Sequence, residues 1–247
     1  MIILGDIGNT ETKICIVKDN KIIKKFLIPS KGKKMRILDK HFKKFNFSKL
    51  KKLLFCSVVP SSFKELKNYF KNKTHIKCFE LKELNLRSVL KIDVNYRQVG
   101  SDRLANAICV SAKNKNFIIL DFGTATTFDV IKNNQYLGGL IFPGINLSME
   151  TLLKNAELIK TSKISKSNKI VNNNTSASIQ SGFYFGYLHA VNGILKQIIK
   201  ENNFKPKVYI TGGLGKIFRD KIIYKPIYME HLTLEGIKEI GNKHFYE

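Results

Sequence analysis

Apolar and polar residues alternate at the start of the chain in a pattern that is typical of antiparallel strands. This alternation predicts a strand over residues 2–4, a turn over residues 5–10 and a second strand over residues 13–17. A third predicted strand over residues 21–28 follows a short polar turn. We therefore expect the chain to begin with a three-stranded meander.

Apolar residues with helical spacing occur between the strands that follow. The spacing predicts helices over residues 37–47, 63–72 and 101–114, a buried strand that ends at Pro60, and a short strand near residues 75–79. Strands that alternate with helices in this way are typical of an α/β domain.

The strand pattern of the first residues returns in the second half of the chain. The stretch NFIILDFGTATTFDVI predicts a strand, a glycine turn and a strand, and QYLGGLIFPG predicts a third strand. Helices are expected over residues 146–158 and 176–202, a strand with a glycine-rich turn in KVYITGGLGKIF, and a last helix over residues 233–244. Both halves contain an apolar strand, Asp-x-Gly, a small polar residue and a threonine, which indicates a diverged internal repeat.

The repeat predicts an α/β fold of two similar lobes with a cleft between them. We expect the first lobe to span residues 1–114 and the second to span residues 115–247.

The composition is that of a globular protein with a large excess of positive charge. Hydrophobic residues make up 43% of the 247 residues, and the longest apolar run is far shorter than the ~20 residues of a membrane span. We therefore expect a cytoplasmic protein with neither a signal peptide nor a membrane segment. The net charge of +24 suggests nucleic acid, but the lysines are dispersed among apolar residues and no nucleic-acid motif accompanies them, so no such partner is expected.

The four cysteines form no CxxC motif and no cluster with histidine. Zinc and iron–sulfur sites therefore have little support, and we expect ordinary buried thiols.

Each Asp-x-Gly turn offers groups that can bind phosphate. A glycine lets backbone N–H groups approach phosphate oxygens without a Cβ in the way. Asp6 and Asp121 offer carboxylates for a cation such as Mg²⁺, and Lys13 can neutralise phosphate charge. Further amide or hydroxyl donors are Asn9, Thr10, Thr124, Thr126 and Thr127. A hairpin explains one such turn alone, whereas a matching pair in two repeats favours a phosphate clamp.

Two other phosphate-binding motifs are missing from the sequence. TGGLGKIF lacks the first glycine of a Walker A motif and the hydroxyl after Lys216, and GxGxxG does not occur. Gly212 and Gly213 form either a close-approach turn beside an adenosine moiety or a strand-to-helix turn.

Six short motifs occur in order along the chain: DIGNT, GSDRLAN, DFGTATTFD, GGLIFPG, TSASIQSG and TGG. Together they closely resemble the type III pantothenate kinases of the acetate kinase, sugar kinase and actin-like ATPase superfamily. The resemblance implies two ribonuclease H-like, actin-like lobes with a nucleotide cleft between them. It implies ATP-dependent phosphorylation of pantothenate to 4'-phosphopantothenate, the first step of coenzyme A biosynthesis. It also implies a homodimer that needs Mg²⁺ and a monovalent cation, K⁺ or NH₄⁺.

The resemblance also assigns residues to the nucleotide. The segment that would hold the ATP phosphates and Mg²⁺ consists of Asp6, Ile7, Gly8, Asn9, Thr10, Glu11, Thr12 and Lys13. Asp121 matches the ligand of the monovalent cation, and Thr124 matches a further ATP contact.

The substrate motif of the family corresponds to Gly100, Ser101, Asp102 and Arg103. Asp102 matches the catalytic base, and a carboxylate in this role makes chemical sense because a primary alcohol is a poor nucleophile until its proton is accepted. Arg103 either orients the substrate or pairs with Asp102 and keeps it ionised. Without the other motifs, Asp102 and Arg103 would be an ion pair at a helix N-terminus.

Two further substrate residues follow from the resemblance. Thr175 matches a threonine that contacts pantothenate from the neighbouring protomer, although Thr175 or Ser176 can equally cap a helix. The family's pocket tyrosine is replaced by Asp93 in an ungapped alignment, and a small shift of the loop would bring Tyr96 into its role.

Two alternatives to a pantothenate kinase stay open at this point. One is a kinase of the same superfamily with another hydroxyl substrate, which the replaced tyrosine would allow. The other is a nucleotide-binding regulator without phosphoryl transfer, against which the presence of Asp6, Asp102 and Asp121 argues.

Overall fold

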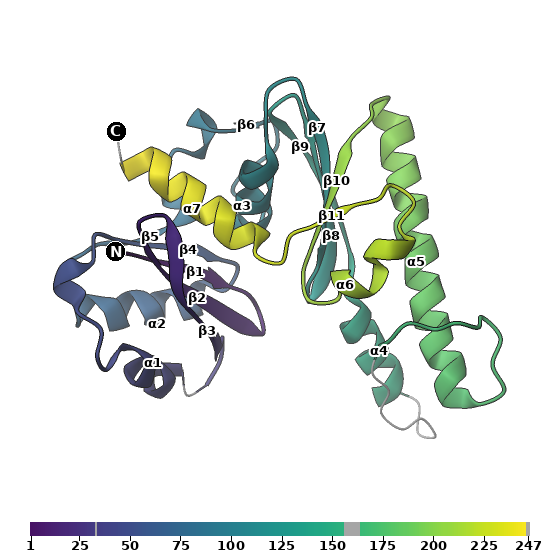
Figure 1. Ribbon diagram of the computed structural model, residues 1–247, viewed down its shortest axis with the longest axis horizontal. Helices are drawn as coiled ribbons and strands as arrows, with labels where there is room; N and C mark the ends of the chain where they lie inside the picture. The colour runs from purple at the N-terminus through teal and green to yellow at the C-terminus, as the bar shows by residue number, and fades with distance from the viewer. Residues whose placement is uncertain (33, 156–163, 246–247) are drawn as a thin grey trace. The chain divides into compact units, whose positions relative to one another are not determined.

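The computed structural model of the protein describes residues 1–32, 34–155 and 164–245. These residues form two compact α/β units (Figure 1). The first unit comprises Met1–Val110 together with the C-terminal segment from His231, and the second comprises Ser111–Glu230.

The described helices and strands follow the predicted order, with two additional short strands at Lys91–Ile92 and Ile227–Tyr228 that the sequence did not indicate. The strands are β1 (Ile2–Ile7), β2 (Glu11–Lys18), β3 (Lys21–Pro29), β4 (Lys52–Ser57), β5 (Cys78–Glu80), β6 (Lys91–Ile92), β7 (Asn116–Phe122), β8 (Ala125–Lys132), β9 (Gln135–Pro143), β10 (Lys207–Thr211) and β11 (Ile227–Tyr228). The α-helices are α1 (Lys34–Phe42), α2 (Pro60–Lys71), α3 (Ser101–Val110), α4 (Ile145–Lys154), α5 (Thr175–Asn202), α6 (Gly215–Phe218) and α7 (Leu232–Phe245). Short 3₁₀ turns occupy Phe47–Lys49, Leu81–Glu83, Leu86–Ser88 and Arg219–Lys221.

The first unit is built on a five-stranded sheet of order β3-β2-β1-β4-β5. Strands β1, β2 and β3 form the predicted antiparallel meander, and β4 and β5 extend the sheet in parallel to β1. The predicted turn over residues 5–10 is shorter than expected, because β1 continues through Gly5 and Asp6 to Ile7. Gly5 serves the packing of the sheet here, since a Cβ at this position would collide with the ring of Phe55.

The strands of the second unit repeat this topology in the order β11-β10-β7-β8-β9. Strands β7, β8 and β9 form an antiparallel meander, and β10 and β11 run parallel to β7. In both units, the outer hairpin has a two-residue turn with positive φ at both residues, Asp19 and Asn20 in one case and Asn133 and Asn134 in the other. Such turns match the twist of a hairpin, and their shared position confirms the internal repeat.

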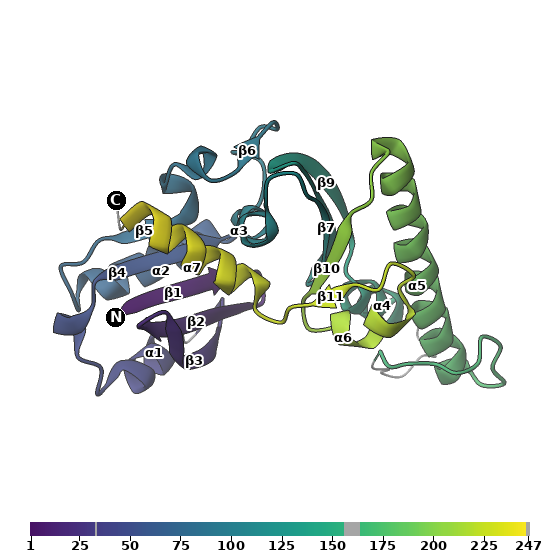
Figure 2. The same cartoon turned by 45° about the horizontal axis from the view of Figure 1, so that its top comes forward.

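Helices cover both faces of the first sheet (Figures 1 and 2). Ile3 and Ile7 of β1 alternate onto the face that is covered by α1 and α2, where Leu38 and Phe70 complete a buried core. On the other face, α7 packs against α3, β1 and β4.

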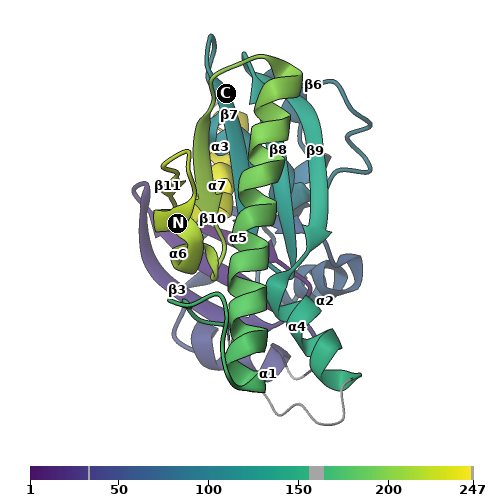
Figure 3. The ribbon, with the colours of Figure 1, turned by 90° about the vertical axis from the view of Figure 1, so that its right-hand side faces the viewer.

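The long helix α5 covers one face of the second sheet (Figure 3). Tyr184, Val191 and Leu195 of α5 lie in a buried cluster with Ile118 and Leu120 of β7. Helical spacing therefore gives α5 one apolar stripe that packs on the sheet. Among the described residues, no helix combines the length and the apolar character that a membrane crossing requires.

The boundaries of the two units differ from the predicted lobes of 1–114 and 115–247. Helix α7 belongs to the first unit, because its residue Gly236 lies directly against the carbonyl of Ala105 and its residue Thr233 donates a hydrogen bond to Asn106 Oδ1 at 2.9 Å. Helix boundaries also differ from expectation, since α1 begins and ends earlier than residues 37–47, α2 begins at Pro60 rather than at residue 63, and α3 ends at Val110. Residues 156–158 of the helix predicted over 146–158 lie outside the described residues.

The four cysteines are free thiols, as expected. Cys15, Cys56 and Cys78 are buried and Cys109 is partly exposed. Burial raises the pKa of Cys15 to about 11 and the pKa values of Cys78 and Cys109 to about 12. Such thiols stay protonated at neutral pH and are inert.

Candidate active site

The first turn joins β1 to β2 and carries a carboxylate and an ammonium group on neighbouring strands. Asp6 pairs in register with Lys13, and Lys13 Nζ lies 3.9 Å from Asp6 Oδ2. The Asp6 side chain is 15% exposed and that of Lys13 is 38% exposed, so both groups remain accessible from solvent.

The tip of this turn is exposed, and its base is buried. Asn9, Thr10 and Glu11 are exposed, and Gly8 N–H donates to Glu11 O at 3.0 Å to close the turn. Ile7 and Thr12 are buried at 1% and 0% exposure, so their side chains face the core. Ile7 and Thr12 belong to the segment that is expected to hold ATP, but they can offer only backbone groups to a ligand.

Three carboxylates gather at the carboxyl ends of the parallel strands β1, β4 and β5. Asp6 pairs in register with Cys56 of β4, and the negative charges of Asp6, Asp102 and Glu80, after burial itself, hold the pKa of the Cys56 thiol well above its usual value. In α/β sheets, ligands bind outside the carboxyl ends of parallel strands. The structure therefore brings Asp6 and Asp102 to the edge of the sheet where a ligand is expected.

Glu80 is a residue that the sequence reasoning missed. Its carboxylate accepts hydrogen bonds from Ser101 Oγ at 2.6 Å, from Ser57 N–H at 3.3 Å and from Lys82 N–H at 2.7 Å. These bonds tie the ends of β4 and β5 to the first residue of α3. The sequence does contain a signal for Glu80, because a carboxylate directly follows the short strand predicted near residues 75–79.

Asp102 lies in the first turn of α3 with its carboxylate partly enclosed. Its Oδ1 accepts a hydrogen bond from Arg103 N–H at 2.8 Å, and Gly100 leaves no room for a Cβ beside the same oxygen. Burial raises the pKa of Asp102, while the hydrogen bond from Arg103 and the positive charge of Arg103 oppose that rise. A carboxylate with a raised pKa is a better proton acceptor than an ordinary aspartate when it is ionised.

The second turn joins β7 to β8 and places Asp121 as the first turn places Asp6. Asp121 is the residue before the last in β7, and it pairs in register with Thr127 of β8 and with Thr211 of β10. Thr124 is exposed at the tip of the turn, whereas Thr126 is buried at 1% exposure. Asp121 and Thr124 are thus neighbours on one turn.

At two glycines, one after β9 and one after β10, the backbone lies directly against this second turn. A Cβ on Gly144 would collide with the carbonyl oxygen of Thr124, and a Cβ on Gly212 would lie 2.5 Å from the carbonyl oxygen of Phe122. Gly212 also has a φ of +85°, which favours glycine. The glycine-rich stretch after β10 is therefore a strand-to-helix turn that leads into α6 and lies against the end of β7. A place beside an adenosine moiety stays a prediction.

Tyr96 and Thr175 lie in different units. The Tyr96 hydroxyl donates to Lys82 O at 3.1 Å, and the ring lines a cavity of about 510 Å³ in the first unit together with Arg87, Asn95 and other residues of the loop. Thr175 is exposed as the first residue of α5 in the second unit. The helix is capped by Asn174, whose side chain accepts from Ala177 N–H at 2.9 Å, so the expectation of a Thr175 or Ser176 cap is wrong.

Solved structures define the class of the fold. A Campylobacter jejuni protein assigned provisionally to the Baf family of transcriptional activators superposes with a TM-score of 0.63 at 21% identity, over 99% of this chain and all of that chain. A Sinorhizobium meliloti protein named provisionally as a 2-dehydro-3-deoxygalactonokinase also has a TM-score of 0.63, at 10% identity, over 99% of this chain and 97% of the other. The chain therefore shares the α/β fold of these two proteins, one of which is named provisionally as a sugar kinase.

Sequence comparison gives the family within this class. The type III pantothenate kinase family model matches residues 2–197. A type III pantothenate kinase of Pelagibacter ubique is 45% identical over 96% of this chain and 97% of its own length, and one of Sulfurihydrogenibium is 34% identical over 96% and 98%. The chain belongs to the type III pantothenate kinase family. Its reaction is the ATP-dependent phosphorylation of pantothenate, the first step of coenzyme A biosynthesis, rather than the phosphorylation of another hydroxyl substrate or nucleotide-dependent regulation.

Proposed function

We propose that Asp102 is the general base of this pantothenate kinase and that the segment from Asp6 to Lys13 holds the ATP phosphates. The observation that carries the proposal is the position of Asp6 and Asp102, whose charges both act on Cys56 at the carboxyl ends of β1 and β4. Both groups that phosphoryl transfer requires, a phosphate site and a proton acceptor, then lie at one edge of one sheet.

In the proposed reaction, the pantothenate hydroxyl gives its proton to the Asp102 carboxylate while its oxygen forms a bond to the γ-phosphorus of ATP. The bond between that phosphorus and the bridging oxygen breaks, and ADP leaves with the electron pair. Burial raises the pKa of Asp102, which strengthens it as a proton acceptor. Arg103, whose charge opposes that rise, keeps the carboxylate ionised before the transfer.

The residues at the first turn fit a magnesium nucleotide. Mg²⁺ in kinase sites is held by one or two carboxylates together with phosphate oxygens, and it neutralises charge on the transferred group. Asp6 is a partly exposed carboxylate beside a turn with exposed backbone, which suits this mode of binding. In the described part of the chain, no cluster of three or more His, Cys, Asp and Glu could hold a metal ion by itself. Lys13, 3.9 Å from Asp6, would neutralise a phosphate oxygen.

The second turn and the substrate contacts complete the proposal. Asp121 would hold the monovalent cation, K⁺ or NH₄⁺, and Thr124 would contact ATP from the exposed tip of its turn. Gly100, Ser101, Arg103 and Tyr96 would contact pantothenate, and Thr175 would do so from the neighbouring protomer of a cytoplasmic homodimer. An exposed Thr175 at the start of α5 supports a contact with another chain.

The test is turnover of pantothenate by an Asp102→Asn variant. We expect kcat to fall by about 10²- to 10⁴-fold, the usual contribution of a general base, while KM for ATP stays within about twofold. Asp39→Asn is the matched control, because Asp39 is an exposed carboxylate of α1 in the same unit. A loss of less than about fivefold in Asp102→Asn would show that Asp102 is not the base.

The same assay in K⁺ and in Na⁺ buffers tests the monovalent site. Turnover in K⁺ with little turnover in Na⁺ supports a cation site, and equal turnover in both buffers would remove Asp121 from that role.

A further inference from the structure

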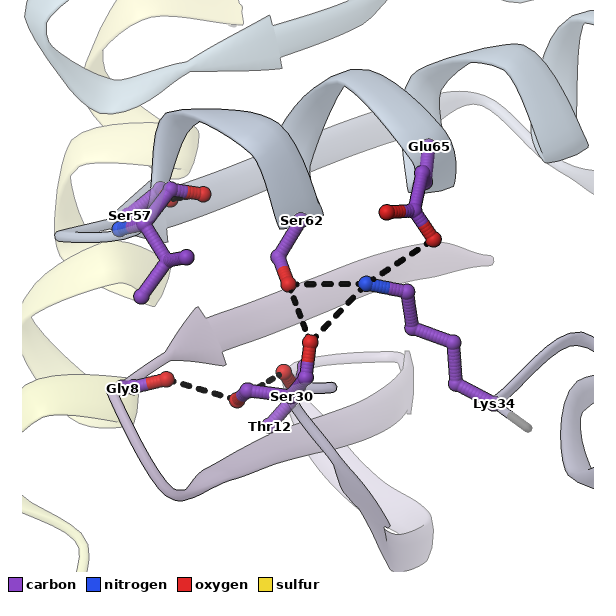
Figure 4. Close-up of polar contacts among 8 residues, drawn as sticks. Gly8, Thr12, Ser30, Lys34, Ser57, Ser62 and Glu65 are labelled. Carbon is purple, nitrogen blue, oxygen red and sulfur yellow. Dashed lines mark hydrogen bonds and ion pairs between the residues drawn. The ribbon is translucent and has the colours of Figure 1, made fainter. Parts of the chain in front are cut away.

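Lys34, the first residue of α1, is a lysine with a buried ammonium group. Its side chain is 2% exposed, and Nζ donates to Ser30 O at 2.9 Å and to Ser62 Oγ at 2.8 Å (Figure 4). It also lies 3.1 Å from Glu65 Oε2, on a side chain that is 54% exposed. These three acceptors match the three protons of an ammonium group.

Ser30 connects this lysine to the first turn. Its N–H donates to Thr10 O at 3.1 Å. Its Oγ–H donates to Gly8 O at 2.6 Å (Figure 4). Because the Ser30 hydroxyl proton is used on Gly8, the hydroxyl contact of 2.9 Å between Thr12 and Ser30 must have Thr12 as its donor. Ser30 therefore holds the carbonyls on both sides of Asn9.

The direction of the Gly8 carbonyl decides where the Asn9 N–H points. The described peptide bonds are all trans, and the C=O and N–H of one trans peptide point in opposite directions. When Gly8 O is turned toward Ser30, Asn9 N–H is turned away from it at the exposed tip. An N–H group fixed in this way is prepared to donate to a phosphate oxygen without a cost of reorientation.

We propose that Lys34 is a positioning residue that acts through Ser30 to orient the phosphate-binding turn of the kinase. The inference rests on the proposed function, because it requires that residues 6–13 bind the ATP phosphates. Lys34 fixes the Ser30 carbonyl, and Ser62 Oγ donates to the same carbonyl. The orientation of the Ser30 backbone then determines the position of its N–H and hydroxyl donors to Thr10 and Gly8.

Energetics favour positioning over stability as the role of Lys34. Desolvation of an ammonium group is costly, and a buried ion pair is often matched or exceeded in stability by apolar residues of similar volume. Glu65 is exposed and would be solvated if its partner were removed. Replacement of Lys34 by an apolar residue therefore leaves no buried charge without a partner.

The second unit supports this interpretation by contrast. Strand β3 ends at Pro29, which pairs in register with Glu11, and β9 ends at Pro143, which pairs with Ala125. The next residues are Ser30 and Gly144, so they occupy equivalent positions beside the two turns. Gly144 meets its turn by direct backbone contact, whereas Ser30 uses hydrogen bonds that Lys34 supports.

The experiment measures KM for ATP and KM for pantothenate in Lys34→Met, together with thermal unfolding. We expect KM for ATP to rise by about tenfold, since small misplacements of binding groups have large kinetic effects, while KM for pantothenate and the Tm change little. Lys52→Met is the matched control, because Lys52 is a half-buried lysine in the first position of β4, and the candidate site lies at the other, carboxyl end of that strand. A variant that loses Tm while both KM values stay unchanged would make Lys34 a stability residue and overturn the proposal.

Three further substitutions separate the possible explanations. In a double-mutant cycle, Ser30→Ala and Lys34→Met should be strongly non-additive in KM for ATP, because Lys34 acts through Ser30, whereas additive effects would contradict the proposal.

Lys13→Met tests whether the turn itself binds ATP. If Lys13→Met leaves ATP binding unchanged, the proposed function of the turn fails. If Lys13→Met weakens ATP binding and Lys34→Met does not, only the role of Lys34 fails. Ser62→Ala, which retains the charge but removes an acceptor of Lys34, is the second variant if Lys34→Met does not fold, and an unchanged KM for ATP in it would also overturn the proposal.

Discussion

The two turns of this kinase have the same topology but are held in place by different means. Each follows the first strand of a meander, and each has an aspartate one residue before that strand ends, Asp6 or Asp121. The first turn is held by hydrogen bonds from the hydroxyl and the backbone N–H of Ser30, and the second by backbone packing at Gly144 and Gly212.

This difference indicates how a duplicated unit can diverge without a change of strand order. The register of each hairpin is preserved, including an irregularity two or three residues before each outer turn. The residue after the third strand differs between the two units, Ser30 in one and Gly144 in the other, and it contacts the turn from outside the strand ladder. A side chain at this position gives adjustable hydrogen bonds, and a glycine gives a fixed backbone contact.

The largest effect should come from Gly144→Ala. The added Cβ would collide with the Thr124 carbonyl, and backbone atoms cannot shift without moving the whole turn, so we expect a loss of about 3 kcal/mol or more in the free energy of unfolding. Denaturant unfolding of the variant and of the unaltered protein measures this change in the free energy of unfolding. Gly182→Ala in α5 is the matched control, since nothing lies within 4 Å of its added Cβ, and it should be neutral or stabilising by about 0.5–1 kcal/mol. Equal effects of the two substitutions would contradict the packing of the second turn.

A smaller effect is expected at Arg103, which acts on the Asp102 carboxylate. Its positive charge lowers the pKa of Asp102, so Arg103→Gln should raise that pKa, and the acidic limb of kcat/KM should move to higher pH by about one unit. Activity is lost as the pH falls through the pKa of the base, and therefore the loss begins at a higher pH in the variant. Lys82→Met should shift the limb in the same direction but less, because Lys82 has the weakest influence on Asp102 of the groups that act on it. A limb that stays in place or moves to lower pH would contradict the pairing of Arg103 with Asp102.

Much of the fold was predictable because its signals are local. Alternation along β7, β8 and β9 and the long helical spacing of α5 depend on periodicity alone, and all four elements lie where the sequence predicts them. The repeat followed from two short matching motifs. The family followed from six motifs in order, which include these two, and the comparisons confirm it.

Contacts between segments that are distant in sequence could not be predicted in this way. Helix α7 packs on α3 through Gly236, yet the pattern of α7 does not indicate which helix its apolar face covers. Glu80 and Lys34 are an ordinary acid and an ordinary lysine in a chain with many charged residues. Their roles depend on partners such as Ser101 and Ser30, which only the folded arrangement brings near.

The central claim is that the first turn binds the ATP phosphates through backbone N–H groups that Ser30 orients. The most direct measurement is the ¹⁵N–¹H chemical shift of the Asn9 amide during titration with a non-hydrolysable ATP analogue and Mg²⁺. We predict that the Asn9 amide shifts with the same saturation curve as analogue binding, and that in Lys34→Met it shifts only at higher concentrations of the analogue. An Asn9 amide that does not shift while the analogue saturates the protein would contradict the account.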